Sequence, residues 1–225
     1  MKSSLVVALF SLLLLMNVTA QTNYSIHGNI NGLLDNSKVY LINPELGKRI
    51  DSAVVHDKKF ELKGHLTEFA FTYLYLEKSV KLADILLDNR QVNVTGSAPI
   101  YDSITVSGSI IDEEWRQWFK EDERFRGMWY RLHKISKSLL TIKDTIHSNQ
   151  VLQVADELTA ERIILLKTYV KKYKDSPSSV VLPSLCTLQK YLTKTDYLEM
   201  YNSLSFAMRN TSLGKEMKEL STKSK

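Results

Sequence analysis

The sequence predicts an α+β fold, with an N-terminal antiparallel β-sandwich over residues 21–108 and a helical region over residues 109–220. Two observations support this prediction. As far as Gly108, short runs rich in β-branched and aromatic residues alternate with turn residues, which is typical of strands. From Ser109 onward, apolar residues recur every three or four positions, which is the period of an amphipathic helix. We expect the polar tail, residues 221–225, to be disordered.

Residues 1–20 have the pattern of a secretory signal peptide. Lys2 supplies the positive start, an apolar run of 12 residues covers positions 5–16, and small residues end at Ala20, the expected cleavage point. Twelve apolar residues are too few for a membrane span, which needs about 20. Gln21 stands where a lipoprotein needs a cysteine. We therefore expect an exported chain, periplasmic or secreted, that is neither a lipoprotein nor inserted in the membrane after cleavage.

Eight short runs before Gly108 are expected to be strands. They are separated by turn residues such as Gly32, Gly47 and Gly64, at a spacing typical of a sandwich or an open barrel. The expected strands cover residues 24–30, 37–43, 49–55, 58–65, 70–77, 82–88, 91–95 and 103–106.

The clearest strand pattern lies in residues 50–64. Val55 precedes a polar turn at 57–59, and Phe60 and Leu62 follow the turn with a period of two. We expect the two flanks of this turn to pair as an antiparallel hairpin with its apolar face on the core.

The second half is expected to form five helices. Ser109 and Asp112 have the spacing of a capping box at the start of the first helix, and a break is expected near Gly127. Ser176 and Pro177 are expected to start the third helix, as its N-cap and its first residue. The expected helices cover residues 110–142, 151–173, 177–192, 196–207 and 213–220.

The order of these segments resembles a known family, the exported TlpA-like proteins of Bacteroidota. The strand segments are similar to the β-rich domain of unknown function that precedes the thioredoxin-like (AhpC/TSA-type) domain in that family. They are Tyr-Ser-Ile-His-Gly-Asn-Ile (24–30), Lys-Val-Tyr-Leu (38–41), Ile-Asp-Ser-Ala-Val (50–54), Phe-Glu-Leu-Lys-Gly (60–64) and Thr-Val-Ser-Gly-Ser (105–109). Residues 169–177 and 210–215 resemble the helical segment of the same proteins.

One feature of that family is missing from this sequence. The thioredoxin-like domain carries a Cys-x-x-Cys pair, and this sequence has a single cysteine, Cys186. The resemblance therefore implies an exported two-part module that lacks the thioredoxin-like domain itself. Such a module either stands alone or works beside a thioredoxin-like partner.

Catalytic chemistry finds little support in the residue pattern. Cys186 lies in an apolar segment, residues 180–188, so we expect it to pack in the core, and a reactive thiol is the alternative. A single cysteine also excludes a disulfide scaffold. The five histidines show no metal-ligand spacing, and the sequence contains neither a Gly-x-Ser-x-Gly elbow nor a glycine-rich phosphate loop. We predict no catalytic residue, no cofactor and no metal.

Aromatic residues gather at the start of the first helix. These residues either seal the helices onto the sandwich or form an exposed ridge for a partner. The candidates for a partner surface are Trp115, Trp118, Phe119, Trp129 and Tyr130. Basic residues near them are interleaved with acidic ones, and the chain is expected to be exported, so we do not expect nucleic-acid binding.

The function that we favour is an exported, non-catalytic binding module. It would dock a periplasmic thioredoxin-like oxidoreductase or a surface ligand. Two alternatives stay open: a single-cysteine thiol redox role through Cys186, and a structural component of an envelope assembly. An exposed aromatic patch would favour binding, an open Cys186 would favour thiol chemistry, and self-association would favour assembly.

Overall fold

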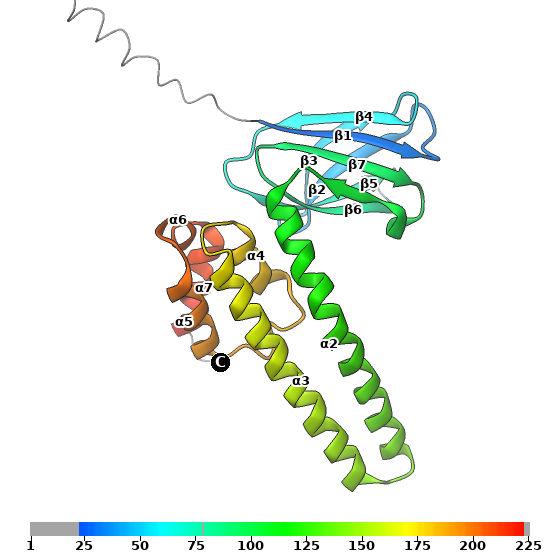
Figure 1. Cartoon of the computed structure of the whole chain (residues 1–225). Helices are drawn as coiled ribbons and strands as arrows, with labels where there is room; N and C mark the ends of the chain where they lie inside the picture. Colours follow the sequence, from blue (N-terminus) through cyan, green and yellow to red (C-terminus); the bar gives the residue numbers. More distant parts are fainter. Residues whose placement is uncertain (1–22, 78, 223–225) are drawn as a thin grey trace, which may run out of the picture.

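The computed structural model describes residues 23–77 and 79–222, and it confirms an α+β fold (Figure 1). The expected signal peptide lies outside the described residues. A β-rich region comes first in the chain and a helical region follows it. The eight strands of the described part are β1 (Tyr24–Asn31), β2 (Lys38–Asn43), β3 (Lys48–Val54), β4 (Lys59–Gly64), β5 (Ala70–Leu76), β6 (Val80–Leu87), β7 (Gln91–Ser97) and β8 (Thr105–Ser107).

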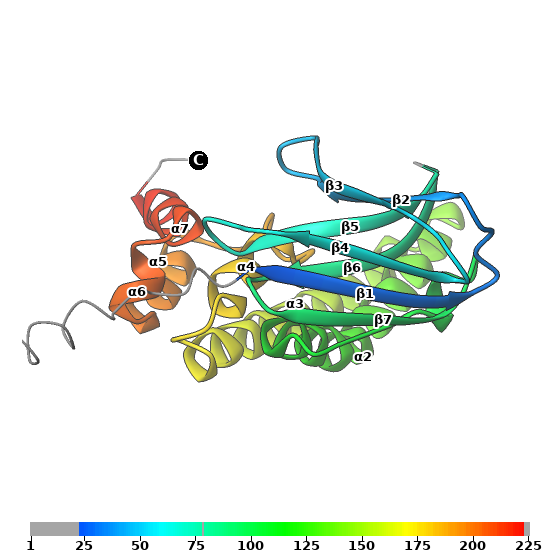
Figure 2. The same ribbon diagram turned by 90° about the horizontal axis from the view of Figure 1, so that it is seen from above.

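The strands form two four-stranded sheets that stack on each other. One sheet has the order β4-β1-β7-β8 and the other has the order β3-β2-β5-β6. Every neighbouring pair is antiparallel except β1 and β7, which run parallel. The sandwich is therefore mainly, but not wholly, antiparallel. Figure 2 shows the stacked sheets from above, with α5, α6 and α7 gathered to one side of them.

The prediction that residues 50–64 form a hairpin is wrong. β3 pairs with β2 and β4 pairs with β1, so the two flanks of the turn belong to different sheets. The turn itself is present: Asp57 and Lys58 have positive φ, and His56 and Lys59 exchange backbone hydrogen bonds of 2.9 Å. Pairing stops there because the chain passes from one sheet to the other.

The apolar face of this segment does lie on the core. Val55 is fully buried, and Phe60 and Leu62 are almost so. They join the inward-facing side chains of both sheets, such as Ile26 on β1 and Leu74 on β5. Because the chain crosses from one sheet to the other at this turn, its two flanks cover the core from opposite sides. A hairpin within one sheet would cover the core from one side only.

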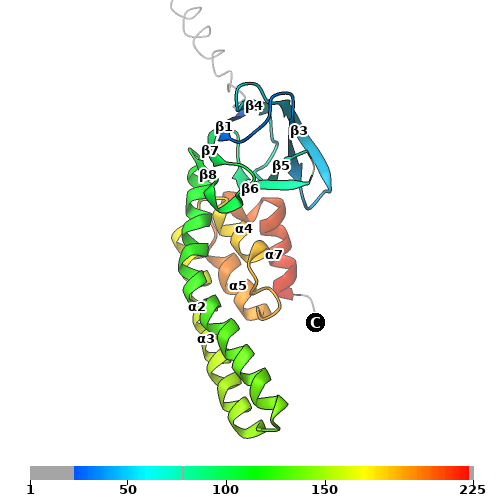
Figure 3. The same ribbon diagram turned by 90° about the vertical axis from the view of Figure 1, so that its right-hand side faces the viewer.

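Two long antiparallel helices dominate the helical region. They are α2 (Ile110–Thr141) and α3 (Thr145–Lys172). Their outer ends extend well beyond the rest of the molecule as an arm (Figures 1 and 3). α4 (Ser178–Leu185), α5 (Lys194–Ser203), α6 (Phe206–Arg209) and α7 (Ser212–Thr222) pack near the inner end of this pair.

The helix boundaries differ from the expected ones in several places. α2 is continuous through Gly127, because glycine keeps its backbone N–H and weakens a helix without breaking it. α4 begins at Ser178, with Pro177 as the N-cap, although the Ser178 N–H still donates to Ser176 Oγ at 3.4 Å. α4 ends at Leu185 because the backbone of the next residue, Cys186, is extended.

The C-terminal helices also differ from expectation. The expected fourth helix is divided into α5 and α6, because Leu204 adopts an extended conformation after α5 ends. α5 starts at a complete capping box between Thr193 and Asp196. The first two residues of the expected tail, Ser221 and Thr222, belong to α7. The rest of that tail lies outside the described residues.

Candidate functional site

A groove of about 570 Å³ lies between the outer face of the β3-β2-β5-β6 sheet and α2. We call it the aromatic groove, because four of its eight lining residues are aromatic. The sheet contributes Phe71, Tyr73 and Asp84. The helices contribute Trp115, Arg116, Phe119 and Lys120 from α2 and Leu185 from α4.

The alternation of β5 explains the sheet wall. Thr72 and Leu74 point into the sandwich and are fully buried. Their neighbours Phe71, Tyr73 and Tyr75 therefore point to the outer face and stay partly exposed. A strand with large apolar residues on both faces needs a cover on each side. α2 covers Phe71 but leaves Tyr73 half-buried at the groove.

The spacing of α2 explains the helix wall. Trp115 and Phe119 are four residues apart, so they lie on one face of the helix and their rings touch. Together with β5 they complete an unbroken row of rings that crosses from the sheet to the helix. The centroid distances along the row are 6.0 Å for Tyr75–Tyr73, 5.4 Å for Tyr73–Phe71, 5.3 Å for Phe71–Trp115, 4.8 Å for Trp115–Phe119 and 4.8 Å for Phe119–Trp118.

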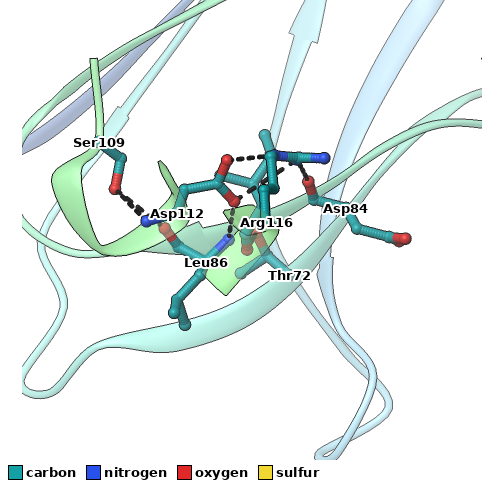
Figure 4. Close-up of polar contacts among 7 residues, drawn as sticks. Thr72, Asp84, Leu86, Ser109, Asp112 and Arg116 are labelled. Atoms are coloured by element: carbon teal, nitrogen blue, oxygen red, sulfur yellow. Dashed lines mark hydrogen bonds and ion pairs between the residues drawn. The ribbon is translucent and has the colours of Figure 1, made fainter. Parts of the chain in front are cut away.

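Asp112 fixes the two walls relative to each other (Figure 4). The backbone N–H of Leu86 on β6 donates to Asp112 Oδ1 at 2.9 Å, and Arg116 Nε donates to Asp112 Oδ2 at 2.5 Å. Arg116 Nη2 also donates to the backbone oxygen of Asp84. Ser109 Oγ donates to the Leu86 oxygen at 3.2 Å and accepts from the Asp112 N–H at 3.3 Å. Three side chains from the N-cap and first turns of α2 thus bind the backbone of β6.

Burial dominates the electrostatics of this joint. Asp112 is almost completely buried, and burial raises the pKa of its carboxyl group above the ordinary value. The Arg116 guanidinium and the Leu86 N–H act in the opposite direction, because both stabilise the carboxylate. A buried acid that binds two elements makes the relative position of sheet and helix sensitive to its charge.

Basic side chains surround the rings of the aromatic groove. Lys81 Nζ lies 4.6 Å from the centre of the Tyr73 ring and 2.8 Å from Asp84 Oδ1. The Arg116 guanidinium lies 5.4 Å from the Trp115 ring, and Lys120 is exposed. The groove therefore combines aromatic surface with positive charge, and the one carboxylate in its wall is paired with Lys81.

The comparisons with known proteins concern the β-rich half. Residues 24–115 match the family model described as Domain of unknown function (DUF4369). The chain contains a DUF4369 domain over this range. Neither the search of curated proteins nor the search of solved structures found a match.

The DUF4369 domain ends inside α2. The matched range runs past Asp112 to Trp115, so it includes the joint with β6 and the first aromatic residue of the helix wall. Phe119, Lys120 and Leu185 lie beyond it. The aromatic groove is thus shared between the DUF4369 domain and the helices that follow.

The structure separates the five aromatic residues of the expected partner surface into two groups. Trp115 and Trp118 are buried, and Trp115 packs against Phe71 of the sheet. Phe119 lines the groove. Trp129 and Tyr130 lie about 20 Å further along α2, at 1.5 Å per residue. The five aromatic residues therefore do not form a single surface.

The outer aromatic group has its own neighbours. The Trp129 ring lies 3.7 Å from the His133 ring and 6.4 Å from the Tyr191 ring, and Lys190 lies 5.8 Å from Trp129. Tyr130 is 57% exposed. Trp129, Tyr130 and His133 lie on α2, and none of them lines the aromatic groove.

Sequence reasoning missed Phe71, Tyr73 and Arg116 as site residues. A signal was present for the first two, because apolar and aromatic residues fill both faces of the strand at 70–77. No signal in the sequence pointed to Arg116, whose place depends on the contact of α2 with β6.

Cys186 lies in the interior of the helical region. It is 3% exposed, and its Sγ lies 3.6 Å from the Pro183 oxygen. Burial raises the pKa of its thiol to about 11, so the thiol is protonated at neutral pH. This setting differs from that of a reactive cysteine, which is open and close to positive charge.

Residues 23–77 and 79–222 contain no group of three or more His, Cys, Asp or Glu side chains arranged to hold a metal ion. In the same part of the chain, no helix has the length and apolar character that a membrane span requires.

Proposed function

We propose that this chain is an exported, non-catalytic binding module, and that its aromatic groove docks a protein partner in the periplasm. The observation that supports this function is the continuous row of aromatic rings, partly exposed and bordered by Arg116, Lys81 and Lys120. Aromatic and arginine side chains are enriched at the centres of protein interfaces, where they supply most of the binding energy.

The charged groups of the groove support a structural and recognition role. Arg116 is bound to Asp112 and to the backbone of Asp84, and Asp84 is paired with Lys81. These contacts hold the walls in place before any partner arrives. A preformed site loses little conformational entropy on binding, which favours docking.

The partner that we propose is a periplasmic thioredoxin-like oxidoreductase. The resemblance of the sequence to TlpA-like proteins supports this choice, because the β-rich domain precedes a thioredoxin-like domain there. The positive border of the groove favours a partner surface with apolar side chains and carboxylates. A surface ligand with the same chemistry is the alternative occupant.

The test measures binding of a purified thioredoxin-like oxidoreductase from the same envelope to the mature chain, by isothermal titration calorimetry. The groove variants are Tyr73→Ala and Lys120→Glu. The control is Tyr130→Ala, which removes an exposed aromatic residue outside the groove. We expect at least tenfold weaker binding for Tyr73→Ala, since losing a central aromatic side chain costs about 2 kcal/mol or more.

The control separates this account from a non-specific one. Tyr130→Ala is expected to bind as the wild type does. Equal affinity of the wild type and both groove variants would overturn the proposal. If the oxidoreductase does not bind at all, the same variants compared in capture from periplasmic extract decide whether another partner uses the groove.

A further inference from the structure

The arm formed by the outer parts of α2 and α3 is a two-stranded antiparallel coiled coil. The residues at its seam alternate at spacings of three and four, as in a heptad repeat. Two contacts set the register: Arg162 Nε donates to Asp122 Oδ1 at 2.6 Å, and Ser136 Oγ lies 2.8 Å from Ser148 Oγ. The seam residues are Asp122, Phe125, Trp129, Leu132, Ser136 and Leu139 on α2, and Ser148, Leu152, Ala155, Thr159 and Arg162 on α3.

A second row of apolar residues lies beside the seam. Met128 and Ile135 each stand one position before a seam residue of α2, and Ile142 continues this row at the same spacing of seven. Val151 and Leu158 stand at the equivalent position of α3. In an antiparallel pair, these positions of both helices lie on the same side. They form an apolar strip in which Met128, Ile135 and Ile142 are 40%, 50% and 72% exposed.

The strip faces away from the other helices. Ile163 follows the seam residue Arg162, and Phe119 and Val170 occupy the same heptad position, so all three lie on the opposite side of the pair. They pack in the core of the helical region. The contact of Trp129 with Tyr191 lies on that side as well. α4 to α7 therefore leave the strip uncovered.

The two helices of the arm carry opposite charge. Residues 124–143 of the chain have six basic side chains and no acidic one, and residues 144–161 have four acidic side chains and neither Lys nor Arg. The basic residues are Arg124, Arg126, Arg131, Lys134, Lys137 and Lys143. The acidic residues are Asp144, Asp156, Glu157 and Glu161.

We infer that a second copy of this chain packs on the apolar strip, so that two arms form an antiparallel four-helix bundle. A two-fold axis parallel to the arms places α2 of each copy over α3 of the other, and every neighbouring pair of helices is then antiparallel. The basic outer part of α2 then lies over the acidic outer part of α3 of the other copy. A two-fold axis across the arms would place basic α2 over basic α2, which charge repulsion opposes.

The register of the arm identifies a specific contact. Asp122 and Arg162 are in contact, so they lie at the same height along the arm. Because the two helices run antiparallel, Arg124 and Glu161 lie at about the same height as each other. Both are exposed and border the strip. In the dimer, Arg124 of one copy lies over Glu161 of the other, and the symmetry repeats the pair.

The size of the strip agrees with a reversible dimer. About five turns of two helices give an area roughly 27 Å long and roughly 20 Å wide on each copy. The dimer then buries roughly 1,100 Å², slightly above the 1,000 Å² or so that a specific interface needs.

Sedimentation equilibrium of the mature chain, from about 1 to 200 µM, tests the inference. We expect a monomer–dimer equilibrium that Ile135→Glu shifts at least tenfold toward monomer, because a charge replaces an apolar side chain in the strip. Leu140→Glu is the matched control: Leu140 is also 50% exposed on α2, but on the other side of the seam. This variant is expected to dimerise as the wild type does. Circular dichroism establishes that each variant is folded.

A charge swap tests the orientation of the two copies. Arg124→Glu alone is expected to weaken the dimer, and adding Glu161→Arg to the same chain is expected to restore it, because each copy carries both halves of the pair. A wild type that stays monomeric up to 200 µM, or equal dissociation by Ile135→Glu and Leu140→Glu, would overturn the dimer. A double variant as weak as the single one would overturn the parallel arrangement of the arms.

Discussion

Asp112 shows how one residue serves two elements. From the sequence, its spacing to Ser109 predicts a capping box. In the structure, only half of that box forms: Ser109 Oγ accepts from the Asp112 N–H, and the Asp112 carboxylate binds Leu86 and Arg116 instead. The partners of the Asp112 carboxylate could not be predicted from the sequence, because they depend on β6 lying next to α2.

Replacing Asp112 tests this joint by the free energy of unfolding. Asp112→Ala leaves the buried Leu86 N–H without its acceptor, which costs about 1–3 kcal/mol. Asp112→Asn keeps an oxygen for that N–H, so it is expected to cost less. Urea unfolding followed by circular dichroism measures both. If the two variants were equally destabilised, the Leu86 contact would not be the main contribution of Asp112.

The pH dependence of stability has a definite sign at Asp112. Burial raises its pKa in the folded state, so between the ordinary value of 3.8 and the raised value the folded chain binds the proton more tightly than the unfolded chain. The free energy of unfolding of the wild type, compared with Asp112→Asn, is therefore expected to fall as pH rises through that window. An increase across the same window would contradict the cause that we assign.

Cys186 provides the third prediction at this scale. Because the thiol is buried and its pKa is raised to about 11, we expect it to react with a thiol reagent at pH 8 no faster than the fold opens. The control is the same protein in denaturant, where reaction is fast. Fast reaction of the native protein, increasing well below pH 8.5, would support the thiol redox alternative instead.

At the scale of elements, the pair of α2 and α3 depends on a buried ion pair. Arg162 donates to both carboxylate oxygens of Asp122, at 2.6 and 2.8 Å, and also to Thr187 Oγ1 at 2.9 Å. Both charged side chains are almost completely buried. Such a pair adds little net stability over apolar residues, but removing one partner leaves a buried charge.

Substitutions at this pair give an element-scale prediction. Asp122→Ala is expected to lower the free energy of unfolding by about 3–5 kcal/mol, because Arg162 stays buried without its partner. The double variant Asp122→Leu with Arg162→Met is expected to be less destabilised than the single one. Denaturant unfolding measures the difference. Equal losses would show that packing, and not the unpaired charge, sets the cost.

The strands and helices were predictable to different degrees. Period and turn residues located the eight strands, because each strand has one face in the core. Which strands pair was harder to predict. The turn at Asp57 and Lys58 suggested a hairpin, but its flanks enter different sheets. Only the closure of the whole sandwich decides that outcome. Gly127 likewise suggested a break, but the α2 backbone continues through it.

At the scale of the molecule, the two halves share structure. Leu86 of the sheet packs in the core of the helical region. The N–H and Oγ of Ser212, at the start of α7, donate to the carboxylate of Glu68 at 3.1 and 2.6 Å. Glu68 lies in the loop between β4 and β5, so a residue of the β-rich half caps the last helix.

This arrangement predicts that the halves unfold together. We expect amide protons of β1 and α3 to lose protection at the same urea concentration, as in a two-state transition. Glu68→Ala is expected to lower the common midpoint by the cost of a lost cap, about 1 kcal/mol. Separate midpoints in the wild type would show two independent units.

The candidate site itself was only partly predictable. Trp115 and Phe119 were candidates from the sequence, but Trp129 and Tyr130 were grouped with them because helical spacing gives no position along the molecule. Tyr73 joins the site only through the contact of β5 with α2. A site shared by two regions cannot be assembled from the pattern of either one.

Photo-crosslinking in cells that produce the chain tests docking at the aromatic groove most directly. A benzoylphenylalanine placed at Tyr73 samples the aromatic groove, and the same residue placed at Tyr130 samples exposed surface outside it. We predict a specific protein adduct from position 73 and none from position 130. The same adduct from both positions, or from position 130 alone, would contradict docking at the groove.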